Sequence, residues 1–307
     1  MFLRLLFATF LLASTAASAQ DSADQPIKVE VKLVNVFATV TDALGHPVNT
    51  LTKDDFQLFE DDIPQKIAIF QQQSSLPLSI IVCIDTSLST QLDLKFEQQS
   101  ARRFAKDVVD PENHDAMALY EFSRDVDELV PFTSSLHRID DGIAAPHAGS
   151  NTALYDAIYL GSQALSKRQG RKVMVLITDG GDNGSNVSYQ EALRAAQQSE
   201  ALLYSVIIVP IEASAGRNTG GEHALIQLAR DTGAQAFYAD SSQQLDHAFS
   251  QISTELRNQY LLAYYPAKRL ADSDFRSISI QLADSPRTHG RQLSIRHRTG
   301  YYTSKLE

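Results

Sequence analysis

The chain has 307 residues, enough for one large domain or two smaller ones with buried cores. Its formal net charge of −10 argues against nucleic acid as the main ligand, because a nucleic-acid-binding surface needs a concentration of basic residues. The single cysteine, Cys83, excludes an internal disulfide bridge. Because Cys83 lies inside an apolar run, we expect a buried small side chain rather than a reactive thiol.

The first 19 residues have the pattern of a secretory signal peptide. Arg4 supplies the positive charge, Leu5 to Ala13 is apolar, and Ala17-Ser18-Ala19 is a small-residue cleavage site. The apolar stretch is shorter than the ~20 residues of a membrane-spanning helix, and no later segment is long enough either. We therefore expect an exported protein, periplasmic or secreted, that begins at Gln20 and has no membrane span.

Residues 20–75 are predicted to form a β-rich N-terminal segment. Residues 27–37 partly alternate between apolar and charged side chains, as an antiparallel strand with one exposed face does. Turn-forming residues follow at 41–48, and residues 56–70 are typical of a strand, a turn and a second strand. The turn, at residues 60–64, lacks the repeated oxygen spacing of a calcium loop, so we interpret it as a hairpin turn.

From residue 76 to residue 258 the pattern changes to strands that alternate with helices. Apolar runs predict six strands, at 80–85, 116–122, 126–132, 173–178, 202–209 and 235–239. Helical spacing of apolar residues is found at 101–108, from Thr152, near 190–200, near 223–232 and at 245–256. This order predicts an α/β fold, with a doubly wound, mostly parallel six-stranded sheet and helices on both faces.

Polar residues follow two of these buried strands. The first strand ends in a D-x-S-x-S motif (85–89), the strand at 173–178 ends in Asp179 and a glycine turn, and Thr152 stands at the start of a helix. Open α/β sheets bind ligands at the carboxyl ends of their strands. Carboxylates and hydroxyls are hard oxygen donors that suit Mg²⁺, which keeps some of its waters. Each residue alone can simply cap a helix or a turn, but the three motifs together favour a metal site.

With these motifs the chain resembles the von Willebrand factor A (VWA) domain over about residues 76–258. The metal-ion-dependent adhesion site (MIDAS) of that family combines D-x-S-x-S, a Thr in a later loop and an Asp in a T-D-G turn. The matching residues are Asp85, Ser87, Ser89, Thr152 and Asp179.

The resemblance implies a role for each residue of this set. Asp85 supplies negative charge, Ser87 and Ser89 coordinate the ion directly, and Thr152 does so directly or through a water. Asp179 orients waters and hydroxyls around the ion. One coordination position is left for a carboxylate from a protein partner. We expect Mg²⁺ or Mn²⁺ rather than Ca²⁺, because the larger ion prefers more oxygens than this set offers.

Two neighbouring features have open interpretations. Asp182, three residues after Asp179, either binds a second ion or tunes the first, or belongs to a surface turn. The loop at 210–222 leaves the same edge of the predicted sheet, and it either borders a partner surface or has no role.

Residues 259–307 return to a β pattern, with strands expected at 259–265, 275–282 and 292–298. We expect them to pack with residues 20–75 as one sandwich into which the VWA domain is inserted. Both flanks also resemble those of secreted bacterial VWA-related proteins, at 42–48, 51–56, 60–67 and 259–266. Asp62 replaces the usual Gly of the turn, and Asp tolerates a left-handed backbone. The basic residues Arg287, Arg291, Arg296 and Arg298 are interpreted as a solvated strand face rather than a site for a polyanion.

The predicted function is a divalent-metal-dependent protein-binding module, for adhesion or complex assembly, in the cell envelope. The sequence has no G-x-S-x-G motif, no Gly-rich phosphate loop and no H-x-x-x-H spacing, so we expect no enzymatic activity. Two alternatives remain open. One is a Mg²⁺-dependent hydrolase at the same site, for which the sequence offers no convincing general base. The other is a structural envelope component that has lost ligand binding.

Overall fold

The structure is a computed structural model that describes residues 33–72, 75–87, 94–144, 149–209, 218–267 and 275–303. The expected signal peptide and the first part of the strand predicted at 27–37 lie outside these residues.

A six-stranded sheet forms the central part of the chain, with strand order β10-β9-β8-β5-β6-β7. Its strands are β5 (Leu78–Asp85), β6 (Ala116–Phe122), β7 (Val126–Thr133), β8 (Arg171–Thr178), β9 (Leu202–Ile208) and β10 (Ala236–Ala239). All neighbouring pairs are parallel except β6 and β7, which are antiparallel. The predicted fold class, a mostly parallel α/β sheet, is therefore confirmed.

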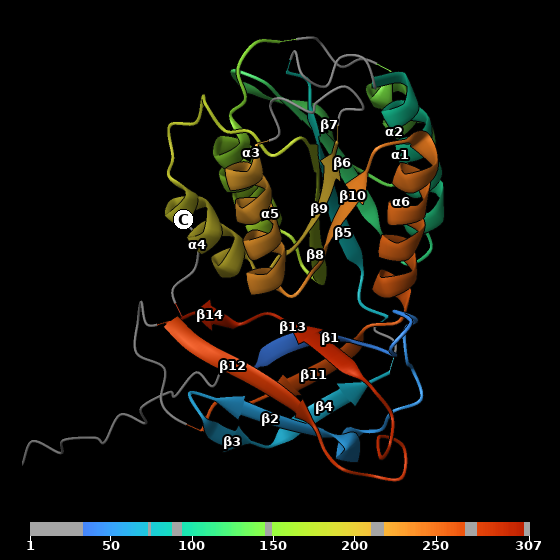
Figure 1. The fold of residues 1–307 in the computed structure, drawn as a ribbon, viewed down its shortest axis with the longest axis vertical. Helices are drawn as coiled ribbons and strands as arrows, with labels where there is room; N and C mark the ends of the chain where they lie inside the picture. The colour runs from blue at the N-terminus through green and yellow to red at the C-terminus, as the bar shows by residue number, and fades with distance from the viewer. Residues whose placement is uncertain are drawn as a thin grey trace, which may run out of the picture. The chain divides into compact units, whose positions relative to one another are not determined.

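Helices cover both faces of this sheet (Figure 1). One face packs against α1 (Leu94–Val108), α2 (Leu136–Ile143) and α6 (Ser242–Arg257), and the other against α3 (Leu154–Ser166), α4 (Tyr189–Ser199) and α5 (Thr219–Thr232). Sequence patterns do not predict α2, because its eight residues are too few for a clear helical period.

Strand β5 is buried on both faces because each face carries its own core. Ile80, Val82 and Ile84 belong to the core under α1 and α6, whereas Ile81 and Cys83 belong to the core under α3. Cys83 is fully buried, as expected, and burial raises the pKa of its thiol far above the ordinary value.

The two flanks combine into two four-stranded sheets, with orders β13-β1-β11-β4 and β14-β12-β2-β3. The strands are β1 (Val34–Thr41), β2 (Phe56–Glu60), β3 (Ile63–Gln65), β4 (Ile67–Gln71), β11 (Tyr260–Tyr264), β12 (Phe275–Leu282), β13 (Ser294–His297) and β14 (Gly300–Tyr302). Strands of the N-terminal flank pair with strands of the C-terminal flank in both sheets. Neither flank makes either sheet by itself. The β-rich assembly predicted from the two flanks is confirmed.

Two details of the N-terminal flank differ from the prediction. Strand β1 continues to Thr41, later than the predicted end at residue 37, and its core-facing residues are Val34, Val36, Ala38 and Val40. The strand predicted after the hairpin turn is two strands: β3 pairs with β2, whereas β4 pairs with β11 in the other sheet. The chain thus changes sheets between Gln65 and Ile67. The turn itself has Asp61 and Asp62 in the left-handed region (φ +47° and +62°), as expected for Asp62.

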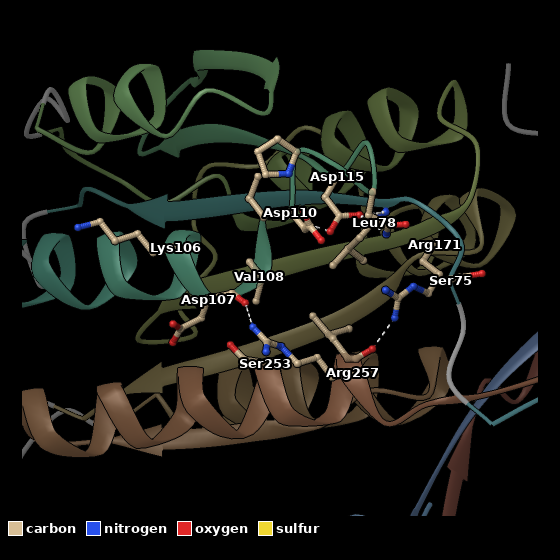
Figure 2. Close-up of a pocket in the computed structure, with 14 residues that line it drawn as sticks. Ser75, Leu78, Lys106, Asp107, Val108, Asp110, Asp115, Arg171, Ser253 and Arg257 are labelled. Carbon is tan, nitrogen blue, oxygen red and sulfur yellow. Dashed lines mark hydrogen bonds between the residues drawn. The ribbon is translucent and has the colours of Figure 1, made fainter.

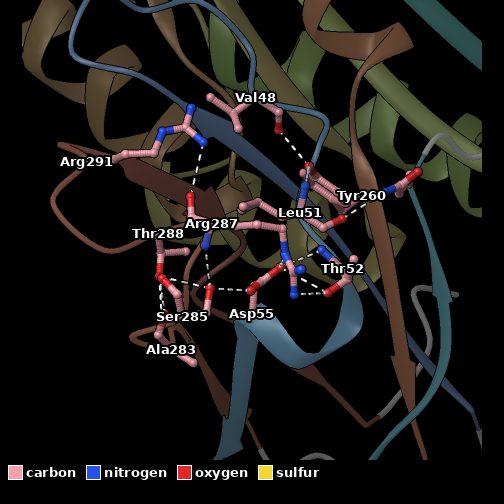
Figure 3. Close-up of polar contacts among 11 residues, drawn as sticks. Val48, Leu51, Thr52, Asp55, Tyr260, Ala283, Ser285, Arg287, Thr288 and Arg291 are labelled. Carbon is pink, nitrogen blue, oxygen red and sulfur yellow. Dashed lines mark hydrogen bonds and ion pairs between the residues drawn. The ribbon is translucent and has the colours of Figure 1, made fainter.

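The 3₁₀ turn η1 (Lys53–Asp55) is tied to the β12–β13 connection by a buried carboxylate (Figure 3). Asp55 accepts hydrogen bonds from Arg287 Nε at 2.6 Å, Ser285 Oγ at 2.5 Å and the Thr52 amide at 2.6 Å. Because Ser285 and Arg287 lie about 230 residues after Asp55 in the sequence, the network joins the two flanks in space.

The segment from Arg296 to Thr299 contacts the helices of the central region. Arg296 pairs with Glu255 of α6 at 2.5 Å, and the Thr299 amide donates to the Asp231 carbonyl near the end of α5 at 3.0 Å. Arg298 donates to the Asn35 carbonyl at 2.7 Å and is only 7% exposed. The interpretation of the four arginines as a solvated strand face is therefore wrong for the buried Arg298, and Arg287 and Arg291 lie in the β12–β13 connection rather than on a strand. Positive side chains near helix C-termini also interact favourably with the helix dipole.

Candidate metal centre

Asp85 is the last residue of β5 and is completely buried. Its Oδ2 accepts a hydrogen bond from Thr178 Oγ1 at 2.6 Å, and its Oδ1 accepts one from the Ser87 amide at 2.9 Å. Thr178 ends β8, the parallel neighbour of β5. The ends of the two strands are therefore joined at the carboxyl edge of the sheet, as the sequence predicts.

Burial raises the pKa of Asp85, and the negative charge of Asp179 raises it further, although hydrogen bonds from Thr178 and Ser87 act in the opposite direction. Asp179 thus acts on Asp85 as a like charge that repels it. A cation between or beside them would relieve that repulsion.

Thr152 lies two residues before α3 and is 5% exposed. Its amide donates to Asn183 Oδ1 at 2.8 Å, and its carbonyl accepts from the amides of Asn183 at 3.0 Å and Gly184 at 3.1 Å. Earlier in the same loop, the Gly149 amide donates to the Thr86 carbonyl at 2.9 Å. The Thr152 loop is thus bonded both to the segment after β5 and to the segment after β8.

Asp179 directly follows β8, and its Oδ1 accepts from the Gly181 amide at 3.1 Å. Gly180 has φ +89°, a conformation that favours glycine. A Cβ at Gly180 would lie 3.1 Å from the Glu222 amide nitrogen, so the first turn of α5 packs directly on the T-D-G turn. This close approach explains why a glycine follows Asp179.

The structure describes some of the remaining predicted residues, and the others lie outside the described ranges. Ser87 is buried and lies two residues after Asp85, the end of β5, whereas Ser89 lies outside the described residues. Asp182 Oδ1 accepts from Ser185 Oγ at 2.5 Å and from the Tyr155 amide at 3.3 Å, so this oxygen helps to cap α3.

Of the loop at 210–222, residues 210–217 are not described. Asn218 caps α5 through the Gly221 amide at 2.9 Å.

The described donors are two carboxylates and two hydroxyls, all of them hard oxygen ligands. Within the described ranges, no group of three or more His, Cys, Asp or Glu side chains could hold a metal ion. Two carboxylates and two hydroxyls, those of Asp85, Asp179, Ser87 and Thr152, are a donor set whose chemistry suits a hydrated Mg²⁺ or Mn²⁺ better than Zn²⁺, which favours nitrogen and sulfur ligands.

Two residues near this site were not singled out from the sequence. Thr178 is the T of the T-D-G motif, so the sequence places it beside Asp179. The sequence does not predict its hydrogen bond to Asp85. Asn183 carried no signal, because an Asn among Gly and Asp residues is typical of any turn.

A cleft of about 810 Å³ lies at the opposite edge of the sheet, where β5 and β8 begin (Figure 2). Arg171 donates to the Leu256 carbonyl at the end of α6, and Arg257 donates to the Asp107 carbonyl at the end of α1. Asp115 accepts from the Leu78 amide at 2.8 Å. These groups are already used to hold helix and strand ends, so the cleft has a structural explanation.

Residues 79–251 match the von Willebrand factor type A domain family, and the chain belongs to it. No curated protein matches the sequence significantly.

Solved structures of similar fold include a von Willebrand factor type A protein from Catenulispora acidiphila, 9% identical, covering 84% of this chain and 73% of that one with a TM-score of 0.51. The pilus adhesin SpaC from Lactobacillus rhamnosus GG, in an open conformation, is 9% identical. It covers 85% of this chain and 48% of that one, with a TM-score of 0.50. The conserved hypothetical protein BatB from Bacteroides thetaiotaomicron is 17% identical, covering 58% of this chain and 98% of that one with a TM-score of 0.47. At these identities the likeness concerns the fold. In the described part of the chain, no helix is long and apolar enough to cross a membrane.

Proposed function

We propose that this chain is an exported, divalent-metal-dependent protein-binding module of the cell envelope, used in adhesion or complex assembly. The observation that carries the proposal is the convergence of three loops at the carboxyl edge of the sheet. The Asp85–Thr178 bond joins two of them, and the backbone bonds between Thr152 and Asn183 join the third.

In this proposal Ser87, Ser89 and Thr152 contribute hydroxyl ligands to the ion. Asp85 and Asp179 supply negative charge and orient the waters that complete its coordination. When bound, Mg²⁺ or Mn²⁺ supplies a positive charge to which an oxygen anion can attach. The position left open takes a carboxylate from a protein partner.

A protein partner is supported by the family and by the fold likeness to SpaC, which is described as a pilus adhesin. The D-x-S-x-S, Thr and T-D-G segments provide metal ligands but no identified general base, and no observation favours the hydrolase alternative. Export remains part of the proposal, supported by the signal-peptide pattern of residues 1–19.

A pull-down tests the proposal directly. The full mature chain is immobilised and exposed to envelope extract of the source cells in Mg²⁺ or in EDTA, in parallel with Asp85→Ala and Asp107→Ala. Asp107 is an exposed carboxylate at the far end of the domain, so it serves as the matched control. We expect a partner that is retained by wild type and Asp107→Ala in Mg²⁺ only, and lost by Asp85→Ala. Equal capture in EDTA, or by Asp85→Ala, would refute metal-dependent binding.

A further inference from the structure

Helix α3 begins beside Thr152 without a side-chain cap of its own. The residue before its first turn is Ala153, which offers no hydrogen-bonding side chain, although the first amides of a helix need partners. The partners come from the loop after Asp179. The Tyr155 amide donates to Ser185 Oγ at 3.0 Å and to Asp182 Oδ1 at 3.3 Å, and the Asp156 amide donates to Ser185 Oγ at 3.1 Å.

The contact is reciprocal. The carboxylate of Asp156 accepts from the amides of Asn186 and Val187, both at 2.9 Å, and from Asn186 Nδ2 at 2.9 Å. Residues 182–187, here called the 182–187 loop, are therefore fixed to the start of α3 from both sides. The loop and the helix start form one hydrogen-bonded unit.

Thr152 is held by the same loop through its backbone. Asn183 accepts from the Thr152 amide with its side chain and donates to the Thr152 carbonyl with its own amide. The direction of the Thr152 hydroxyl is set by its backbone and by few rotamers. Since Asn183 is only four residues from Asp179, the contact fixes Thr152 with respect to the T-D-G turn.

We propose that Asn183 is a positioning residue of the metal site, whose side-chain oxygen holds Thr152 at the geometry the ion requires. Asn183 acts through Thr152 and does not itself contact the ion. This inference rests on the proposed metal-binding function. It adds that the affinity for the ion depends on a residue outside the D-x-S-x-S, Thr and T-D-G set.

The test is calorimetric titration of the full mature chain with Mg²⁺ and Mn²⁺. Asn183→Ala removes the acceptor and should weaken binding by about 10- to 100-fold, the usual effect of losing a group that orients a metal ligand. Asn183→Asp keeps the hydrogen-bond acceptor, and its added negative charge does not weaken cation binding. The affinity of this variant for the ion should therefore be at least that of wild type. Asn186→Ala is the control within the loop, because the Asn186 side chain contacts Asp156 and not Thr152.

A double-mutant cycle distinguishes positioning from a general loss of structure. In a Thr152→Ala background, Asn183→Ala should cause little further loss, because there is no hydroxyl left to position. Hydrogen exchange at the Thr152 amide should accelerate in Asn183→Ala without metal. Wild-type affinity in Asn183→Ala, or full additivity with Thr152→Ala, would overturn the inference and leave the proposed function intact. Absence of metal binding by wild type would overturn both.

Discussion

The hydroxyl of Thr178 donates a 2.6 Å hydrogen bond to the carboxylate of Asp85. Both residues are completely buried, and they end two neighbouring parallel strands that lie 93 residues apart in sequence. The same hydroxyl accepts a bond from the Gly180 amide at 3.1 Å. One oxygen therefore connects the end of β5 to the turn that carries Asp179.

Thr178→Val should destabilise the protein even without metal. Valine has a similar shape but leaves Asp85 and the Gly180 amide without this partner, at a cost of about 1–3 kcal/mol for each buried polar group affected. Thr178→Ser keeps the hydroxyl and is the matched control. Urea unfolding in EDTA measures the effect. Equal stabilities for the two variants would show that the hydrogen bond contributes little.

Asp55 should make the stability depend on acid pH. Burial alone raises its pKa, but hydrogen bonds from Arg287, Ser285 and Thr52 outweigh that effect and hold the pKa well below the ordinary 3.8 (Figure 3). A lowered folded-state pKa stabilises the protein above the unfolded-state value, and that stability is lost as pH falls below about 4.

The free energy of unfolding of wild type should therefore fall more steeply between about pH 5 and pH 3 than that of Asp55→Asn. Asp54→Asn, at the exposed neighbouring position, should keep the wild-type slope. Chemical denaturation at a series of pH values checks this. A slope unchanged in Asp55→Asn would mean that the Asp55 network does not contribute to acid sensitivity.

Gly233 and Gly45 form a matched pair for the contact between α5 and the C-terminal strands. Both have positive φ, +87° and +82°, so alanine at either position is strained by about 1–2 kcal/mol. A Cβ at Gly233 would lie 2.5 Å from backbone atoms of His297 and Arg298, whereas one at Gly45 meets nothing within 4 Å. Gly233→Ala should therefore lose about 1–3 kcal/mol more than Gly45→Ala in thermal or urea unfolding. Equal losses would show that this contact adapts freely.

Cys83 should be inert in the folded protein. It is fully buried, so a reagent cannot reach the sulfur. Burial also raises the pKa of the thiol, so the reactive thiolate does not form at neutral pH. An aromatic disulfide reagent at about pH 8 should react with Cys83 only after denaturant is added. Rapid reaction of the folded protein would contradict the buried position on β5.

The location of Asp85 and Asp179 could be predicted because it depends on strand direction alone. β5 and β8 contain unbroken apolar runs, at 80–84 and 173–177, and parallel neighbours end at the same edge of a sheet. The partners of these residues could not be predicted in the same way. The contact between Thr152 and Asn183 depends on the path of two loops, and a single Asn in a Gly- and Asp-rich turn carries no periodic signal.

Other differences have similar causes. The sequence does not predict that the chain changes sheets between β3 and β4, because both segments have the residue pattern of a strand. The two strands differ only in the partners with which they pair. Arg298 reads as a surface residue in the sequence, but its guanidinium is covered when the flanks pack, with a carbonyl and the ring of Tyr301 as neighbours. The turn at Asp61 and Asp62 was predictable because it depends on local backbone preference.

The central claim is that a divalent ion binds at Asp85. The most direct measurement is the stability of wild type and Asp85→Ala, followed by thermal and urea unfolding in EDTA, Mg²⁺, Mn²⁺ and Ca²⁺. Mg²⁺ or Mn²⁺ at ~100 times its dissociation constant should raise the unfolding free energy of wild type by about 2.7 kcal/mol, with a smaller effect of Ca²⁺ at equal concentration. Asp85→Ala should remain folded in EDTA and show no metal response. An equal stabilisation of both proteins by Mg²⁺ would place the ion elsewhere and contradict the account.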